Sequence, residues 1–378
     1  MNQREQYSDT RGRLASRFPS RCTRIRSAIS AIIVWPLLVG LMLWCAAALW
    51  FDGPRPDWLA GSLAGVFAAG CGILLIFHRP LWRAKLIVAV GVLLIIVWWL
   101  AIPPRNTANW SPDVAQLPRA TFRGDAVTIQ NVRNFDYRSE TDFTERWETR
   151  TYDLSKVRGV DLFLSFWGPT LIAHTIMSWD FAEGPPLAIS IETRKERGEE
   201  YSAVRGFFRQ YEVYYVVADE RDLVRLRTNY RGETTYLYRL RGTPAQAQAL
   251  LREYLAEVNR LAEQPRWYNA LTHNCTTTIR QHVKAMGAGR AWDWRVLANG
   301  RLDELGYERG QINTSLPFAE MKARSNITDK AKAADQAADF SRRIRDGLPD
   351  RPAAMDAAHI SEVLEWEPRS GDSRFCSA

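Results

Sequence analysis

Three long apolar runs in the first third of the chain constrain its architecture most. They cover residues 30–51, 58–77 and 82–102, and each has about the 20 residues that a helix needs to cross a bilayer. The first two contain no charged residue, and the third carries Arg83 and Lys85 only at its start. Tryptophans lie near the ends of the runs, as they do in membrane-interface belts. We therefore predict three transmembrane helices rather than the buried helical hairpin of a soluble domain.

The arginine-rich segment before the first run allows a second interpretation, a cleaved signal peptide. Such peptides have an apolar core of about 7–15 residues followed by a small-residue cleavage site. The run over residues 30–51 is longer than that, and no clear cleavage site follows it. We therefore interpret this run as a membrane helix that the mature protein keeps.

Basic residues determine the predicted orientation. Seven arginines precede the first run, and the second short loop, residues 78–85, is also basic. The first loop, residues 52–57, has one arginine and two aspartates. The positive-inside rule then puts the N-terminus and the second loop in the cytoplasm. We therefore expect a bacterial inner-membrane protein whose part after Pro103 is periplasmic.

The predicted organisation has five parts. They are a cytoplasmic segment (1–29), three transmembrane helices (30–102), a linker (103–118), a periplasmic domain (119–349) and a loosely ordered tail (350–378). The net charge of +8 partly reflects the N-terminal arginines. No basic stripe with interleaved aromatic residues is visible, so we expect no nucleic-acid partner. Five cysteines, two of them in the apolar runs, do not form a disulfide framework.

The soluble part begins with strand-like segments and continues with helices. The strand-like segments are rich in β-branched and aromatic residues and are bounded by Gly, Pro or charged clusters. They cover residues 126–129, 160–166, 171–179, 187–192, 211–217 and 234–238. This order predicts an α+β domain in which packed helices cover an antiparallel sheet.

A helix is predicted directly after the last of these strands. Thr243 is suited to the N-cap, Pro244 to the first helical position, and Gln246 completes a capping box. Apolar side chains then recur at helical spacing over residues 247–261. Two further helical regions are expected, over residues 275–287 and 318–344.

Cys275 lies where the second helix should begin, and a nucleophile has a physical reason to occupy that position. The first N–H groups of a helix have no partner within the helix, and with the helix dipole they favour a thiolate and can donate to an oxyanion. Thr272 or Asn274 can cap this helix, and Thr276 lies in its first turn. The alternatives are a buried structural cysteine and a disulfide with Cys376.

A thiol nucleophile needs a base, and His174 is the candidate. It belongs to a strand-like run about a hundred residues before Cys275, so it can face the cysteine across a cleft. His282 is about two turns along the same helix, roughly 10 Å of rise, which is too far for a direct hydrogen bond. His273 precedes the helix and is expected to point elsewhere, and His359 lies in the tail. The alternative for His174 is an ordinary core histidine.

The base in turn needs an acceptor that orients its second nitrogen. The strand after His174 ends in Glu192, and if the two strands pair, both side chains can share one face. We therefore predict Glu192 as the third catalytic residue, with an ordinary surface glutamate as the alternative. Tyr268, Asn274 and Thr276 are predicted to contact the substrate or the oxyanion, and packing or capping are their alternative roles.

A zinc site is the remaining alternative at this position. His273, Cys275 and His282 are residue types that bind zinc, but the sequence contains no C-x-x-C or H-E-x-x-H pattern. It also lacks a glycine-rich phosphate loop and a G-x-S-x-G elbow. We therefore expect no metal and no cofactor.

Five segments of the soluble part together resemble the bacterial DUF4105 family, also called the Lnb N-terminal periplasmic domain family. They are residues 131–137, 173–178, 190–194, 206–212 and 267–277. The resemblance extends from Arg119 to about Pro349. The family is itself similar to a circularly permuted form of the NlpC/P60 thiol hydrolases of the papain-like superfamily.

This resemblance implies a permuted papain-like domain in which Cys275 matches the nucleophile and His174 the base. Glu192 matches the third polar position only loosely, because NlpC/P60 enzymes commonly use His, Asn or Gln there. The family likeness supplies no substrate, since relatives of the permuted type include peptidases, amidases and lipid acyltransferases.

The sequence therefore predicts a membrane-anchored periplasmic cysteine hydrolase that cleaves an amide or ester through a thioester. Envelope peptides, peptidoglycan stem peptides, and lipoprotein or lipid acyl groups are the candidate substrates. The alternative is a non-catalytic envelope module that binds a peptide or lipid in the same cleft.

The orientation can be tested with reporter fusions. A periplasm-active reporter fused after Arg105 should be active, and the same reporter fused near Arg83 should be inactive, because only the second short loop is basic. Alkaline phosphatase activity in whole cells measures both fusions. The reverse pattern would overturn the predicted compartment and every envelope substrate with it.

Overall fold

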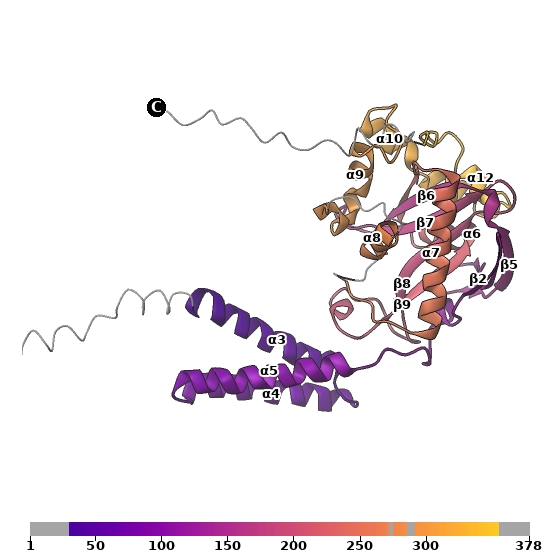
Figure 1. The fold of residues 1–378 in the computed structure, drawn as a ribbon. Helices are drawn as coiled ribbons and strands as arrows, with labels where there is room; N and C mark the ends of the chain where they lie inside the picture. Colours follow the sequence, from indigo (N-terminus) through magenta and orange to yellow (C-terminus); the bar gives the residue numbers. More distant parts are fainter. Residues whose placement is uncertain (1–29, 271, 273–274, 286–291, 355–378) are drawn as a thin grey trace, which may run out of the picture. The chain divides into compact units, whose positions relative to one another are not determined.

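The chain divides into two compact units (Figure 1). The computed structural model describes residues 30–270, 272, 275–285 and 292–354. The first unit holds the apolar N-terminal helices together with residues 208–210, and the second runs from Pro104 onward.

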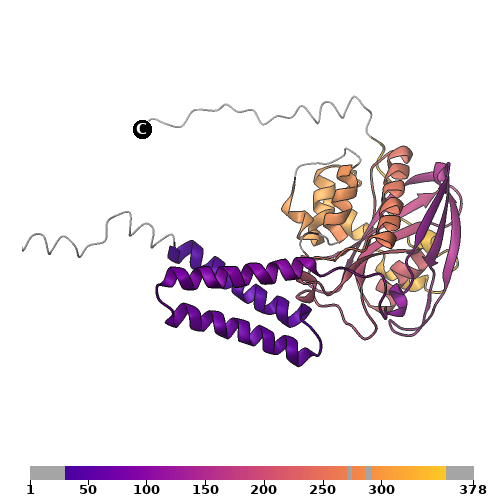
Figure 2. The ribbon, with the colours of Figure 1, turned by 60° about the horizontal axis from the view of Figure 1, so that its bottom comes forward.

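The first unit consists of three long helices that lie side by side (Figure 2). They are α3 (Trp35–Asp52), preceded by the π-helical turn η1 (Ser30–Val34), α4 (Asp57–Phe77) and α5 (Leu81–Ala101). Their buried positions hold cysteine, alanine and valine, whereas Leu43, Val66 and Leu94 point outward with 65%, 73% and 65% of their surface exposed. Small residues at helix contacts are typical of membrane bundles. All three helices are long and apolar enough to cross a membrane, as predicted.

The second unit is built around an eight-stranded sheet. The strand order is β1-β2-β9-β8-β7-β6-β10, and β5 also pairs with β2. The strands are β1 (Arg119–Arg123), β2 (Ala126–Arg133), β5 (Trp147–Asp153), β6 (Val157–Phe166), β7 (His174–Phe181), β8 (Leu187–Arg194), β9 (Glu212–Asp219) and β10 (Thr234–Arg239). Two short strands, β3 (Asp136–Tyr137) and β4 (Phe143–Thr144), form a separate pair.

The sheet is mixed rather than antiparallel throughout. Arg133, the last residue of β2, pairs in parallel with Ala218 of β9, and the other strand pairs are antiparallel. The prediction of an antiparallel sheet is therefore wrong at this one contact. The α+β class with helices packed on a sheet is confirmed.

Helices cover both faces of the sheet. On one face α7 (Pro244–Glu263) and α8 (Cys275–Ala285) pack on an apolar cluster that includes Met177 and Trp179 (Figure 1). The Trp179 indole N–H donates to the Ala247 carbonyl at 2.9 Å. The other face packs on α6 (Glu220–Arg225), α11 (Thr328–Ala333) and α12 (Phe340–Arg343). Successive residues of a strand point to opposite faces, so strand parity decides which layer a side chain enters.

Local signals predicted much of this unit correctly. Thr243 and Gln246 form the expected capping box, with hydrogen bonds of 2.9 and 3.1 Å, and α7 ends at Glu263. Each of the six expected strand segments overlaps an observed strand. The sequence patterns did not predict β1 and β5, because the exposed positions of these strands carry charged or polar side chains that hide the apolar alternation.

Two predicted elements differ from the observed ones. The strand expected from Leu171 begins only at His174. The helix expected over residues 318–344 is broken into α10 (Phe318–Ser325), α11 and α12. The first break occurs because the chain reaches the edge of β10, where the Ile327 N–H donates to the Thr235 carbonyl at 3.0 Å. A backbone N–H used in this way cannot continue the helical ladder.

The segment predicted as a linker, residues 103–118, packs on the second unit. The Asn106 side chain donates to the carbonyls of Leu261 and Ala262, at 3.1 and 3.0 Å, near the end of α7. Trp110 is buried beneath the Arg194 guanidinium, whose carbon lies 4.3 Å from the ring centre. These contacts explain why the compact unit begins at Pro104.

A buried ion pair ties β2 to α6. The Arg133 guanidinium contacts Asp222 with hydrogen bonds of 2.8 to 3.2 Å, and both side chains are at most 2% exposed. The Asp222 carboxylate also accepts from the Phe135 N–H at 2.6 Å. Loss of one partner would leave the other charge buried and uncompensated.

Removal of Asp222 should therefore destabilise the protein strongly. For Asp222→Ala we expect a loss of about 3–5 kcal/mol, because the Arg133 charge would stay buried without its partner. Chemical unfolding of the full chain in detergent, followed by circular dichroism, measures the loss. The matched control is Glu320→Ala, which breaks the exposed Arg324–Glu320 pair and should cost less than about 1 kcal/mol. Equal losses would contradict a structural role for the buried pair.

Candidate functional site

His174 and Glu192 share one face of the sheet at the ends of adjacent strands. β7 pairs with β8 in antiparallel register, with Ile176 opposite Ser190. Continued by two residues on each strand, this register sets His174 opposite Glu192. Both side chains then point to the same face of the sheet as Ile176. The expectation that these two strands lie side by side is confirmed.

Ser190 lies between the histidine and the glutamate, within hydrogen-bond distance of both. The His174 Nε2 atom is 2.6 Å from the Ser190 Oγ atom and 3.5 Å from the Glu192 Oε1 atom. The Ser190 hydroxyl donates to Glu192 at 2.8 Å. A serine hydroxyl has one proton, so the proton in the contact with the histidine comes from Nε2. This hydrogen bonding leaves Nδ1 as the basic nitrogen of neutral His174.

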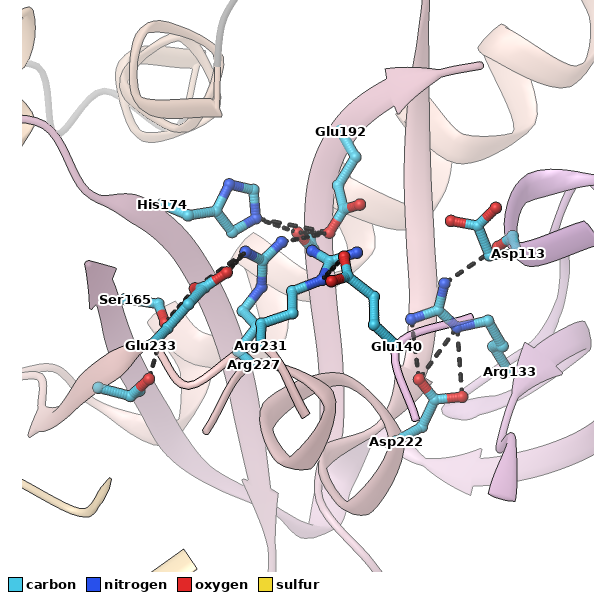
Figure 3. Close-up of polar contacts among 12 residues, drawn as sticks. Asp113, Arg133, Glu140, Ser165, His174, Glu192, Asp222, Arg227, Arg231 and Glu233 are labelled. Carbon is cyan, nitrogen blue, oxygen red and sulfur yellow. Dashed lines mark hydrogen bonds and ion pairs between the residues drawn. The ribbon is translucent and has the colours of Figure 1, made fainter. Parts of the chain in front are cut away.

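A chain of buried charges continues behind Glu192 (Figure 3). Arg227 donates to Glu192 at 2.9 Å and to Glu233 at 3.3 Å. Glu233 in turn accepts from the Ser165 hydroxyl at 2.6 Å. Arg227 is 5% exposed and Glu233 is 4% exposed. The network fixes Glu192, and through Ser190 it fixes the orientation of the His174 ring.

Glu192 is ionised at neutral pH. Burial alone would raise its pKa, but the charges of Arg227, His174 and Arg133 and the hydrogen bonding hold the pKa well below its usual value of 4.5. A carboxyl whose pKa is lowered by folding contributes stability above the unfolded-state pKa, and that stability is lost as the pH falls through the folded-state value. The network is therefore expected to hold at neutral pH and to weaken only in acid.

Helix α8 begins at Cys275, as the sequence predicts. The side chain of Cys275 lies outside the described residues, as do His273 and Asn274. The neighbouring Thr276 is buried. Thr276 is therefore the residue whose contacts locate the start of α8 relative to the sheet.

Asn299 connects the helix start to the beginning of β7. Its side-chain amide donates to the Thr276 hydroxyl at 2.7 Å and to the Ala173 carbonyl at 2.6 Å. Its amide oxygen accepts from the Ala173 N–H at 2.8 Å. Residue 173 precedes the predicted base and residue 276 follows the predicted nucleophile. One side chain therefore holds together the two chain segments that carry the predicted pair.

Gly300 allows the close approach that Asn299 needs. Its N–H donates to the Leu171 carbonyl at 3.0 Å. A Cβ atom at this position would lie 2.0 Å from the Thr170 carbonyl oxygen, so no other residue fits without movement of the backbone. Neither Asn299 nor Gly300 was predicted as part of the site. Asn-Gly is a recognisable turn signal, but a turn signal does not indicate which distant strand the turn contacts.

The His174 ring and the body of α8 lie on opposite faces of the sheet. His174 shares the face of Ile176, which belongs to the cluster beneath α6 and α12. Ile279 and Val283 of α8 pack on the other cluster, which contains Met177. A contact between residues 174 and 275 would therefore have to form around the end of the sheet, beside Asn299.

His282 has a structural role on the α7 face. Its Nε2 atom is 2.7 Å from the Tyr215 hydroxyl, and its ring centre is 4.3 Å from that of Tyr254. Burial lowers the pKa of His282 to about 4, so the ring is neutral at neutral pH. The expectation that it does not act as the base agrees with this position.

Tyr268 lies in the apolar core on the α7 face, where its N–H donates to the Tyr211 carbonyl at 2.8 Å. Its predicted contact with a substrate stays a prediction.

Within residues 30–270, 272, 275–285 and 292–354, no group of three or more His, Cys, Asp or Glu side chains is arranged to hold a metal ion. His273, His359 and Cys376 lie outside those ranges.

One family model matches part of the chain. A family model described as the Lnb N-terminal periplasmic domain matches residues 143–300. The matched range contains His174, Glu192 and Cys275 and ends at Gly300. No curated protein and no solved structure matches the chain. The further likeness to NlpC/P60 thiol hydrolases stays a prediction.

The Asn299 bridge can be tested by removing its hydrogen bonds. Asn299→Ala would leave the Ala173 N–H and carbonyl buried without partners, which costs about 1–3 kcal/mol for each unsatisfied group. We expect a lower unfolding midpoint and faster hydrogen exchange in the peptide that contains Ala173.

Thr276→Val is the matched control, because it removes only the hydroxyl that Asn299 contacts and keeps both bonds to Ala173. It should change exchange at residue 173 far less than Asn299→Ala. Equal effects of the two substitutions would contradict the assignment of the bridge to Asn299.

Proposed function

We propose that this protein is a membrane-anchored cysteine hydrolase that acts in the periplasm on an amide or ester of the cell envelope. The observation that carries the proposal is the Asn299 bridge, which binds the residue before His174 and the residue after Cys275. Two segments a hundred residues apart are thus held at one end of the sheet. Three apolar helices and the periplasmic-domain family match support a membrane-anchored protein.

In the proposed reaction His174 acts through Nδ1. It takes the proton of the Cys275 thiol, and the thiolate attacks the substrate carbonyl to form a tetrahedral intermediate. The intermediate collapses to a thioester as His174 returns the proton to the leaving amine or alcohol. Water then hydrolyses the thioester with His174 again as the base, which regenerates the thiol.

The surroundings of the two residues support these roles. Ser190 and the ionised Glu192 would stabilise the imidazolium that forms on His174, since Nε2 already faces them. The first N–H groups of α8 would favour the thiolate and stabilise the oxyanion. Thr276 and Asn274 are the proposed contributors at this helix start, and Tyr268 is the proposed substrate contact.

Candidate substrates are envelope peptides, peptidoglycan stem peptides, and lipoprotein or lipid acyl groups. The membrane helices keep the domain close to such substrates, and the family match carries a periplasmic description. The reaction uses side chains of this chain alone, so the proposal includes no cofactor and no nucleic-acid partner.

A non-catalytic envelope module that binds a peptide or lipid is the second candidate. The observation in its favour is the position of the His174 ring on the face opposite to α8. In this alternative, the contacts of His174 Nε2 with Ser190, and of Ser190 and Arg227 with Glu192, have a purely structural role: they stabilise the end of the sheet. In that case Cys275 would react as an ordinary thiol.

Thiol reactivity distinguishes the two candidates. The full chain in detergent is treated with a mild epoxide or acyl probe, and labelling is mapped by mass spectrometry. Cys376 provides a reference thiol in the same molecule. We expect Cys275 to react about tenfold faster than Cys376 or more, because a base and a helix start raise the thiolate fraction at neutral pH.

Variants then test the base. His174→Ala should reduce the rate at Cys275 to that of Cys376, and Ser190→Ala should reduce it partly. Ser178→Ala is a matched control, since Ser178 is a buried serine on the same face of β7 that contacts Glu220 at 2.5 Å instead. Unchanged labelling of Cys275 in His174→Ala would reject the catalytic pair and favour the binding module.

A further inference from the structure

A second polar site lies at the opposite end of β7 from His174. A recess of about 800 Å³ opens there between the sheet and the segment that contains α12. Asp180 of β7 lines it, six residues beyond His174, which corresponds to about 20 Å along a strand. The recess is therefore separate from the candidate catalytic site, and its volume is that of a small-molecule site.

The lining of the recess is strongly charged and has an excess of arginine. It contains five arginines and three aspartates: Arg158, Arg221, Arg239, Arg342, Arg345, Asp180, Asp219 and Asp339. Two of the aspartates have arginine partners, because Asp219 pairs with Arg150 at 2.8 Å and Asp339 pairs with Arg343 at 2.6 Å. Three of the arginines, Arg221, Arg342 and Arg345, are paired with carboxylates as well, so the simple count of side chains does not give the charge that a ligand meets.

Arg239 is the lining arginine for which the described residues provide no partner. Its strand register sets it directly opposite Asp161 of β6, the natural position for an ion pair. However, the Asp161 carboxylate already contacts Arg345 and Arg351, both at 2.8 Å. Among the described residues Arg239 has no hydrogen bond or ion pair, and its Nε atom is buried.

Two further groups in the recess have unused hydrogen-bonding capacity. The Arg221 Nε atom is buried without an acceptor in the part of the chain that the structure describes, and the Arg221 contact with Asp136 is 3.5 Å long. The Asn134 side chain donates to Glu148 at 2.8 Å, but its carbonyl oxygen is buried without a donor from the described residues. Buried polar groups without partners cost free energy. A ligand that supplies both acceptors and donors would remove that cost.

These groups specify the chemistry of a ligand. Guanidinium groups bind phosphate through several parallel hydrogen bonds. Phosphate presents enough oxygens to bridge arginines from different strands and helices. A single carboxylate presents only two oxygens and bridges fewer arginines. Asn134 and Asp180 are acceptors, so they suit a ligand with hydroxyl groups. Bare phosphate would leave most of the recess and both acceptors unused.

We propose that this recess binds a small phosphate ester that carries hydroxyl groups. The phosphate contacts Arg221 and Arg239, and the hydroxyl groups donate to Asn134 and Asp180. Arg345 is fully engaged by Asp161 and Glu220, so it shapes the wall without binding the ligand. This inference is independent of the proposed hydrolase activity.

Calorimetry with glycerol 3-phosphate tests the proposal on the full chain in detergent. We expect binding that is tighter than that of inorganic phosphate, and no binding of glycerol. Arg239→Gln should weaken it about tenfold or more, the loss expected for one charge-assisted hydrogen bond. Asp180→Asn should tighten it, because it removes a negative charge and keeps an acceptor. A change that only perturbs the fold would not produce effects of opposite sign.

Further variants complete the test. Arg221→Gln replaces Arg239→Gln if that variant fails to fold, and it should weaken binding similarly. Arg324→Gln, at an exposed arginine of α10, and His174→Ala should leave binding unchanged. Vesicles that contain phosphatidylglycerol test whether the ligand is a lipid headgroup. If the vesicles compete with glycerol 3-phosphate for the recess, the ligand is assigned to a lipid headgroup. If they do not compete, it is assigned to a soluble ester. The proposal would be overturned if glycerol 3-phosphate does not bind at millimolar concentration. It would also be overturned if neither Arg239→Gln nor Arg221→Gln changes the affinity.

Discussion

The end of the β7–β8 ladder is the structural constraint on which the candidate site depends. The paired register stops at Ile176 and Ser190, and Ala173, directly before β7, bonds through both backbone groups to the Asn299 side chain. Backbone groups at a buried strand end need partners, and here a distant asparagine supplies them. Because the same amide also contacts Thr276, the end of β7 and the start of α8 are positioned together. Substitution at Asn299 would therefore disturb both segments.

Buried charge has different consequences at the two ends of this sheet face. At the His174 end, Arg227 lies between Glu192 and Glu233, and each carboxylate has a serine donor as well. Such a connected network restricts the orientations of its side chains. At the other end, Arg345 and Arg351 pair with Asp161, and no other described residue pairs with Arg239. The first arrangement suits a positioned base, and the second suits a bound anion.

Sequence patterns predicted the elements whose signals are local. The capping box of α7 and the apolar alternation of β6 to β9 depend on residues a few positions apart, and both were found. Glu192 was placed beside His174 correctly because adjacent strands often pair. Ser190, Arg227 and Asn299 were missed, since their roles depend on register between segments up to 126 residues apart. The break after α10 was missed for the same reason, because it depends on pairing with β10.

The two faces of the sheet also limit how the proposed chemistry can work. Side chains on opposite faces of a sheet are separated by the backbone layer, and rotation about χ angles does not carry them through it. The His174 ring lies on the α12 face and α8 packs on the α7 face. The backbone layer ends beyond the last paired residues of β7 and β8, where the Asn299 side chain bonds to Ala173. Catalysis by His174 and Cys275 therefore requires the helix start to reach past this strand end, and the Asn299 and Gly300 turn is the part of the structure that determines whether it does.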